Sequence, residues 1–209
     1  MLDITPESII VAAILLLVGL PLHEAAHAFA AYQLGDGTAK LFGRLTLNPI
    51  RHLDPIGSLI LVASVVLGTG FIIGWAKPTP VNPQNLRDRR NGEMIVALAG
   101  PATNLIIACV AALAIRGMVA FWPDVPQLIF DVTWYLVIFN IALTVFNLIP
   151  IPPLDGSTVL FRFLDPATAW RTRMALAQYG FVALILVVLL LGPQLGQWMY
   201  DVSRFLVGA

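Results

Sequence analysis

The sequence predicts an all-α membrane protein, a multi-pass bundle of transmembrane helices with four full crossings and one re-entrant or hairpin segment. Of the 209 residues, 58% are hydrophobic and only 11% are charged. A soluble domain carries about 25% charged residues, so this composition indicates that most of the chain lies in a membrane. The hydrophobic residues also form long runs rather than a scattered core pattern. The formal net charge of zero argues against a nucleic-acid partner.

Four apolar segments are long enough to cross the hydrocarbon core, which takes about 20 residues in a helix. The first begins near Pro6, since proline is favoured at the first helical position, and continues to about Leu34. The other three lie at about 92–117, 128–149 and 174–192. We expect all of them to belong to a single integral-membrane domain over residues 1–209.

Three further segments are shorter or interrupted. Residues 56–74 are apolar but contain four glycines, and each glycine weakens a helix by about 1 kcal/mol relative to alanine. Residues 38–47 and 76–83 combine hydrophobic and turn-forming residues. We expect these last two segments to form short membrane-associated β-strands near the interface.

Polar residues interrupt the first apolar segment at His23-Glu24-Ala25-Ala26-His27, an H-E-x-x-H motif. Residues four apart lie on one face of a helix, so both imidazoles can bind one metal ion. Glu24 lies beside them, where it suits a general base acting on a metal-bound water. Pro21 removes a helical hydrogen bond just before the motif and predicts a kink. Chance produces this motif in on the order of one in a thousand sequences of this composition, so the motif predicts a metal site.

A zinc site usually needs a third protein ligand. The candidates are His52 and the acidic residues, most of which lie at the ends of segments. Asp155 is placed differently, in "FNLIPIPPLDGS" at 146–157, where three prolines break the helix before Asp-Gly. A broken helix at membrane depth is tolerated where it is buried in protein or lines a polar cavity. The alternative is an ordinary interfacial turn with a solvated aspartate, so the pattern alone leaves the third ligand open.

Together these motifs resemble the site-2 protease family of intramembrane zinc metalloproteases. The H-E-x-x-H motif is followed about 120 residues later by "NLIPIPPLDG". The stretches "AGPATNL" at 99–105 and "NPIRHLDPIGS" at 48–58 also match small members of that family. Many members carry an added PDZ or CBS domain, for which this chain has no room.

The resemblance implies that His23, His27 and Asp155 bind one zinc ion and that Glu24 is the catalytic acid/base. It also implies hydrolysis of a peptide bond in or near the transmembrane segment of a membrane-protein substrate, as in regulated intramembrane proteolysis. The expected partners are therefore this substrate and the lipid bilayer, while the oligomeric state stays open.

This ligand set constrains the topology, because the two histidines and Asp155 must lie at the same depth. Both motifs come late in their helices, so the first segment and 128–149 run in the same direction, with an odd number of crossings between them. Two apolar segments lie between them, and the glycine-rich 56–74 is a weaker helix than 92–117. We therefore expect 56–74 to be the re-entrant or hairpin segment.

The distribution of basic residues supports the same topology. Segments 35–55, 75–91 and 150–173 then share one side of the membrane, and they hold ten of the twelve lysines and arginines. The positive-inside rule places such segments in the cytoplasm. We expect a multi-pass protein of the cell membrane with an external N-terminus and an active site toward the cytoplasmic side.

Four other polar residues are candidates for supporting roles. Asn140 and Asn147 lie seven residues apart and share a helix face, so their amides can bind the substrate or the transition state or bond another helix. The resemblance favours Asn140 near the substrate, and Asn147 is expected to secure the broken turn. His52 is either a gating or accessory residue or a structural histidine at the interface. Asn104 is expected to pack between helices.

Two other functions remain open from the sequence. A non-catalytic membrane metal-binding protein or metal transporter also uses histidines and acids inside the membrane, although the chain has one ligand cluster and no inverted repeat. The second is an inactive scaffold of the same fold, but the presence of Glu24 and both histidines in this chain argues against it.

Overall fold

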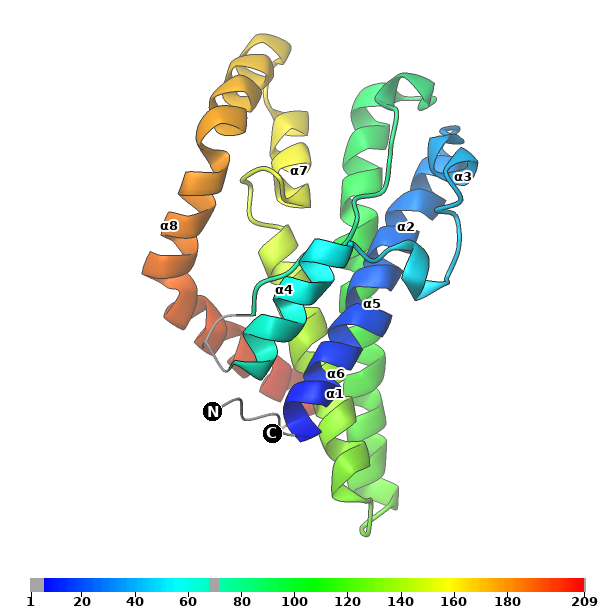
Figure 1. The fold of residues 1–209 in the computed structure, drawn as a ribbon, viewed down its shortest axis with the longest axis vertical. Coiled ribbons are helices and arrows are strands. Elements are labelled where there is room, and N and C mark those ends of the chain that lie inside the picture. Colours follow the sequence, from blue (N-terminus) through cyan, green and yellow to red (C-terminus); the bar gives the residue numbers. More distant parts are fainter. Residues whose placement is uncertain (1–5, 68–71, 209) are drawn as a thin grey trace.

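The structure is a computed structural model that describes residues 6–67 and 72–208. Within these ranges, four helices are long and apolar enough to cross a membrane: Ile9–Gln33, Arg89–Phe121, Gln127–Asn147 and Pro166–Val207. Figure 1 shows that they run mostly along one direction. They coincide with the four predicted crossings, so the all-α, multi-pass architecture is confirmed.

The first crossing is one continuous helical path in three parts. Helix α1 (Pro6–Ile14) leads into a π-helical turn, η1 (Leu15–Gly19), and then into α2 (Leu20–Gln33). The irregularity predicted at Pro21 is this wider turn directly ahead of it. A π-helical turn accommodates a break in the hydrogen-bond ladder and is frequent at functional sites.

Helices α5 (Arg89–Phe121) and α6 (Gln127–Asn147) form the antiparallel centre of the bundle. Alanines of α5 at 108, 111 and 112 pack against Val137 and Ile141 of α6. Small side chains let two helices approach closely, which is the main source of helix association in a membrane. The closely packed pair gives the other helices a rigid support.

The described parts of the 56–74 segment, residues 56–67 and 72–74, lie side by side instead of forming one crossing helix. Helix α4 (Pro55–Val66) has 12 residues, about 18 Å at 1.5 Å per residue, which is too short for a hydrocarbon core of about 30 Å. The chain then returns along it, because Ser64 Oγ bonds the N–H and carbonyl of Ile73 and Trp75 lies against Gly57. The described part is thus a hairpin, as predicted, while residues 68–71 lie outside the described ranges.

The two expected β-strands are wrong. In the described ranges, strand-like pairing is limited to a single antiparallel bridge between Leu53 and Ala76. The 38–47 segment begins instead with α3 (Thr38–Leu41), whose first N–H donates to Asp36 Oδ1 at 3.0 Å. Residues 76–82 lie outside any helix or strand apart from this bridge, and Pro83 begins the 3₁₀ helix η3 (Pro83–Asn85). The 76–83 segment contains three prolines, which lack the N–H that a β-ladder requires.

Helices α7 (Asp155–Phe163) and α8 (Pro166–Val207) complete the fold. The end of α8 packs on the α5–α6 pair through Met199, Val202 and Leu206. In its first half Arg173 lies 3.5 Å from Glu93 of α5, and the helix bends in its lower part (Figure 1). Pro193 lies inside α8, and proline is the usual cause of such a bend.

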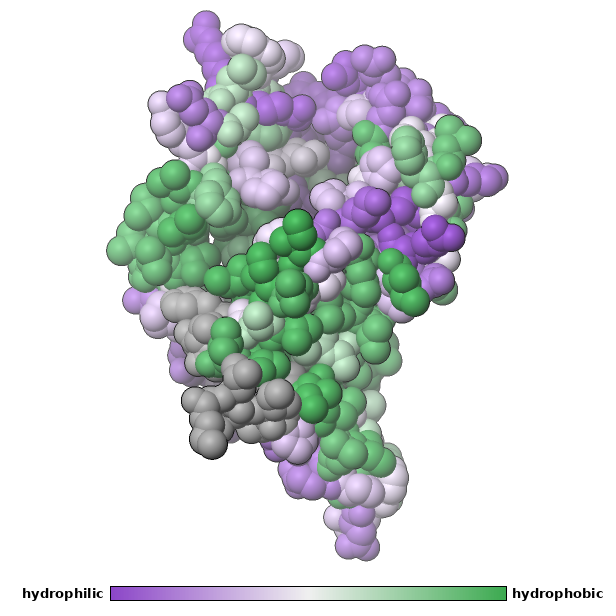
Figure 2. Space-filling model, viewed as in Figure 1, coloured by the Kyte–Doolittle hydropathy of each residue, from purple (hydrophilic) through white to green (hydrophobic). Residues whose placement is uncertain are grey.

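The surface is that of a membrane protein. Figure 2 shows a hydrophobic band around the middle of the visible face and hydrophilic residues at the upper end and the lower tip. Large apolar side chains such as Ile106, Phe181 and Leu190 are 62%, 70% and 69% exposed. Contiguous apolar exposure on this scale is unfavourable in water, and the lipid tails of a bilayer are its matching solvent.

Candidate metal centre

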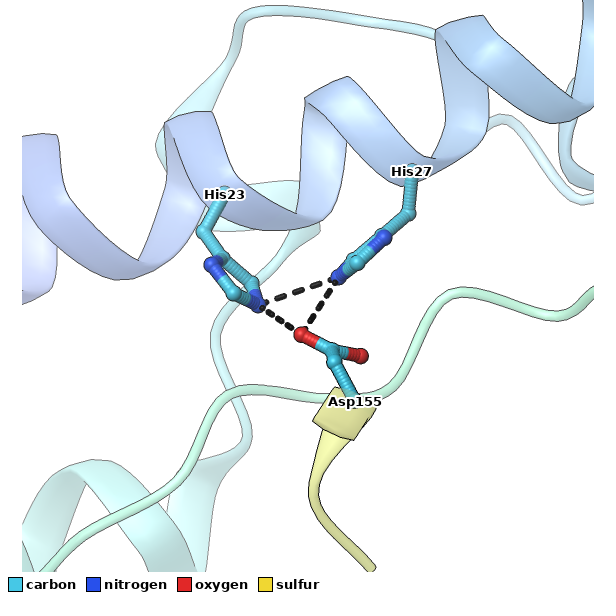
Figure 3. A group of neighbouring side chains, drawn as sticks. All are labelled: His23, His27 and Asp155. Carbon is cyan, nitrogen blue, oxygen red and sulfur yellow. Dashed lines mark hydrogen bonds and ion pairs between the residues drawn. The ribbon is translucent and has the colours of Figure 1, made fainter. Parts of the chain in front are cut away.

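Two helices that are far apart in the sequence, α2 and α7, bring three side chains together. His23 and His27 lie one turn apart on α2, and Asp155 is the first residue of α7. Figure 3 shows both imidazoles and the carboxylate pointing toward one another. Among the described residues, this is the group of histidine, cysteine and acidic side chains whose ligand atoms all lie within 4.8 Å of one another.

The distances between the three ligand atoms match a tetrahedral zinc site. The Nε2 atoms of His23 and His27 are 3.0 Å apart, and they lie 3.1 Å and 3.3 Å from Asp155 Oδ2. Bonds of 2.0–2.1 Å to zinc place two ligand atoms of a tetrahedron about 3.3 Å apart. The three atoms therefore occupy the corners of a zinc coordination sphere and leave the fourth corner open.

The hydrogen bonds made by the Nδ1 atoms of the two imidazoles leave both Nε2 atoms as acceptors, like Asp155 Oδ2. His27 Nδ1 lies 2.7 Å from the carbonyl oxygen of Val96, which only accepts, so Nδ1 carries the hydrogen of the neutral ring. His23 Nδ1 lies 2.7 Å from Asn104 Oδ1. Both Nε2 lone pairs then face Asp155 Oδ2, which is buried with no donor. Three acceptors at this spacing repel one another unless a cation lies between them, and Zn²⁺ fits this donor set.

The broken helix brings Asp155 to the histidines. After α6 ends, residues 148–154 turn back, and Gly156 packs so closely on the backbone of Leu148 that a Cβ has no space there. An ionised aspartate carboxylate is one of the oxygen ligands that zinc takes in proteins.

Gly100 of α5 makes room for the imidazoles. A Cβ at this position lies 2.5 Å from both His23 Cε1 and His27 Nε2. Contacts below 3.0 Å are essentially never observed, so any larger residue displaces the rings. The close approach of α5 also positions Val96 and Asn104 behind them.

Glu24 lies next to the centre but is held by a different segment. Its Oε2 accepts a hydrogen bond from the Thr79 N–H at 2.8 Å, and its backbone carbonyl accepts one from Thr79 Oγ1 at 2.9 Å. The segment that contains Thr79 is itself held by Arg44, which donates to the carbonyls of Lys77 and Pro78. The 76–83 segment thus orients Glu24. The second carboxylate oxygen of Glu24 is left for another partner.

A cavity of about 610 Å³ surrounds these residues. Its lining includes His23, Glu24, His27 and Asp155, and it extends to Asn147 on α6 and to residues of α8. The cavity therefore joins the polar centre to the candidate membrane-spanning helices α5, α6 and α8.

The other predicted site residues have different surroundings. His52 is fully buried, with Nε2 2.8 Å from the carbonyl of Thr46, and it is outside the ligand cluster. Asn140 is also fully buried and is absent from the cavity lining, because its Oδ1 accepts from Asn104 Nδ2 at 2.8 Å. Asn147 does line the cavity, and its amide donates to the carbonyl of Leu143 at 2.9 Å.

Sequence reasoning missed three contributors to the site. Asn104 was expected only to pack between helices, although an asparagine inside an apolar run is itself a polar group that needs a partner. The space that Gly100 leaves for the imidazoles depends on how closely α5 approaches α2. Thr79 has no distinguishing pattern in the sequence, because its role depends on where the 76–83 segment lies.

Comparison with known proteins agrees with this geometry. Residues 117–191, which include Asp155, match the model of peptidase family M50. The chain is 40% identical over 201 residues to "Putative zinc metalloprotease YwhC" of Bacillus subtilis, across 91% of this chain and 86% of that protein. It is 36% identical over 205 residues to "Putative zinc metalloprotease Rip2" of Mycolicibacterium smegmatis, across 92% and 75%. No solved structure matches the chain. The resemblance found in the motifs is thus confirmed, and the chain belongs to peptidase family M50, the site-2 protease family of zinc metalloproteases.

Proposed function

We propose that this protein is an intramembrane zinc endopeptidase that cleaves transmembrane segments of other membrane proteins. The observation that carries the proposal is the cluster of three mutually facing acceptors, His23, His27 and Asp155, in a cavity that also holds Glu24. The family of the chain supports the same chemistry. The cavity is lined in part by the candidate membrane-spanning helices α2, α5, α6 and α8, which supports a substrate that is itself in the membrane.

The residues of the chain have separate roles in this proposal. His23, His27 and Asp155 hold one Zn²⁺ ion, which when bound acts as a Lewis acid toward a water molecule and the scissile carbonyl. Glu24 accepts a proton from the attacking water and passes it to the leaving amine as the C–N bond breaks. The Thr79 N–H holds one oxygen of Glu24, so the other oxygen faces the reacting groups with little freedom to rotate. Asn147, on the cavity wall, is placed to bind the substrate backbone.

The proposed orientation places the active site toward the cytoplasm. Arg90 of α5 donates to the carbonyls of Arg162 and Leu164, which gathers two basic segments at one end of the bundle. At the other end, Arg116 donates to the carbonyls of Phe205 and Leu206. The end with ten of the twelve basic residues is then cytoplasmic by the positive-inside rule.

Cysteine labelling in intact cells tests the orientation. Single cysteines at Lys40 and Asp88, introduced into a Cys109→Ser chain, should both resist a membrane-impermeant maleimide until the membrane is permeabilised. Labelling of the two positions from opposite sides would contradict the hairpin topology. Labelling of both from outside would reverse the proposed orientation.

The proposed activity is tested on the purified protein in detergent or lipid, with a synthetic peptide that contains an apolar segment of about 20 residues. The Glu24→Gln variant should keep one bound zinc ion. Its cleavage rate should fall by about 10²- to 10⁴-fold, the contribution of a general acid/base. Glu7→Gln makes the same chemical change outside the cavity and should leave the rate unchanged. Chelation should abolish cleavage, and zinc should restore it.

The same experiment separates the alternatives. A metal transporter would move zinc across the membrane of vesicles. Neither its wild type nor its Glu24→Gln variant would cleave the peptide. An inactive scaffold binds the peptide without cutting it. Full cleavage by the Glu24→Gln variant would end the proposed mechanism.

A further inference from the structure

We propose that Asn104 is the positioning residue that makes His23 a ligand through Nε2, and that Asn140 holds Asn104 in the required orientation. The inference rests on the proposed zinc site and adds two residues to it. It assigns Asn140 a support role in the interior of the bundle.

The first step is the orientation of the Asn104 amide, whose oxygen and nitrogen have to be assigned from their partners. The amide nitrogen lies 3.1 Å from the carbonyl oxygen of Gly19. A carbonyl only accepts hydrogen bonds, so Nδ2 must face Gly19. The amide oxygen is then the atom that faces His23 Nδ1 at 2.7 Å.

The second step is the tautomer of His23. Because Asn104 Oδ1 is an acceptor, the hydrogen of the neutral imidazole must lie on His23 Nδ1. The Nε2 lone pair is then free and points at Asp155 Oδ2, 3.1 Å away. With the opposite tautomer, Nε2 would carry a hydrogen and could not bind a metal ion.

Asn140 adds a second constraint from α6. Its own Nδ2 donates to the carbonyl of Leu136 at 2.8 Å, so its Oδ1 must face Asn104 Nδ2, also at 2.8 Å. Each amide is therefore oriented by a backbone carbonyl, which can only accept a hydrogen bond. The result is a directed chain of hydrogen bonds in which the imidazole on α2 donates to Asn104 of α5, and Asn104 donates to Asn140 of α6.

Burial makes this chain hard to replace. Asn104 and Asn140 are 0% exposed and His23 is 5% exposed, so the two amides are shielded from water, while His23 also lines the cavity. An unpaired polar group in such a place costs about 1–3 kcal/mol. His27 has no such dependence, because its Nδ1 bonds the backbone carbonyl of Val96. The two histidines of one motif thus differ, and only His23 relies on another side chain for its tautomer.

The experiment measures zinc affinity by competition with a chelator and the histidine tautomers by ¹⁵N NMR, in the full-length protein in detergent. The chain has three histidines, so the resonances are assignable with single substitutions. Asn104→Leu should weaken zinc binding by about 10- to 100-fold, the usual effect of losing the partner of a ligating histidine. In the zinc-free Asn104→Leu protein, His23 should lose its uniform Nδ1–H tautomer.

Three further variants test the direction of the chain. Burial favours the neutral carboxylic acid, so Asn104→Asp keeps an acceptor for His23 and a donor toward Gly19 and Asn140, and it should lose less than about tenfold in zinc affinity. Asn140→Leu leaves the bond between Asn104 and His23 and should have a smaller effect than Asn104→Leu. Thr144→Val is the matched control, because Thr144 also donates to buried carbonyls of α5 and α6 but not to His23, Asn104 or the side-chain amide of Asn140. Its zinc affinity should equal that of the wild type.

The outcomes separate this inference from the proposed function. Absence of zinc binding by the wild-type protein would overturn the proposed function, while the tautomer of zinc-free His23 would still test Asn104. Wild-type zinc affinity and an unchanged Nδ1–H tautomer in Asn104→Leu would overturn the role of Asn104. Equal losses in Asn104→Asp and Asn104→Leu would do the same, because the acceptor would then be irrelevant. If Asn104→Leu does not fold, the comparison of Asn104→Asp with Asn140→Leu decides the question.

Discussion

Gly100→Ala is the substitution expected to damage the metal centre most for the smallest chemical change. One methyl group at this position lies 2.5 Å from His23 Cε1 and His27 Nε2 and 2.7 Å from His23 Nδ1. Carbon atoms in contact are about 3.5–4.0 Å apart, so the rings must move by about 1 Å or α5 must withdraw. Ligand positions have to hold within about 0.5 Å for a functional site.

The magnitude follows from the packing. Forcing an additional methyl group into a filled space costs about 1–3 kcal/mol, and each 1.4 kcal/mol is a factor of ten in a binding constant. The zinc dissociation constant should therefore rise by about 5- to 150-fold. Alanine also favours the helix by about 1 kcal/mol over glycine, so the free energy of unfolding should change less than the free energy of zinc binding.

The assay measures zinc affinity by chelator competition and records thermal unfolding separately. The separate record is needed because Gly100 precedes Pro101, where a Cβ also crowds the proline ring. Gly117→Ala is the matched control, since Gly117 lies on the same helix and has no atom within 4 Å of a Cβ. It should gain helix stability and bind zinc as the wild type does. Wild-type zinc affinity and activity in Gly100→Ala would refute the inferred packing of α5 against the imidazoles.

Two further predictions concern the carboxylates. Asp155→Asn removes the anionic ligand and should lower zinc content to well below one ion per chain, whereas full zinc content would show that another group is the third ligand. Asp36 is 0% exposed and accepts hydrogen bonds from Thr38, Asn82 and Asn85. Burial opposes the ionisation of Asp36, but these hydrogen bonds lower its pKa below the ordinary value of 3.8. A lowered folded-state pKa stabilises the fold above the unfolded-state pKa, and the contribution disappears as the pH falls through the folded-state value. The unfolding temperature should therefore fall as the pH drops below about 3.9, and Asp36→Asn should flatten this part of the profile; an identical acid response in the variant would exclude Asp36 as its cause.

Much of the fold could be predicted because the relevant physics is local. A helix that crosses the bilayer satisfies its own backbone hydrogen bonds, so hydropathy locates the four crossings without knowledge of their neighbours. The hairpin at α4 was predictable from parity, since the histidines and Asp155 must meet at one depth. The expected strands at 38–47 and 76–83 were wrong because strand formation depends on a partner. Prolines removed the donors in one segment, and the other begins with a one-turn helix beside Asp36.

By itself, the sequence determined that His23 and His27 share a helix face, that Glu24 lies beside them, and that the chain spans a membrane. The break at 148–154 and the family resemblance were enough to nominate Asp155. Only the tertiary structure decided which groups lie behind these residues: Asn104 behind His23, Thr79 against Glu24, and Asn140 in the interior away from the cavity. The physical reason is that a periodic pattern specifies which face of a helix is apolar. Hydrogen bonds between residues 36 to 81 positions apart depend on the depth and rotation of packed helices, which the pattern does not contain.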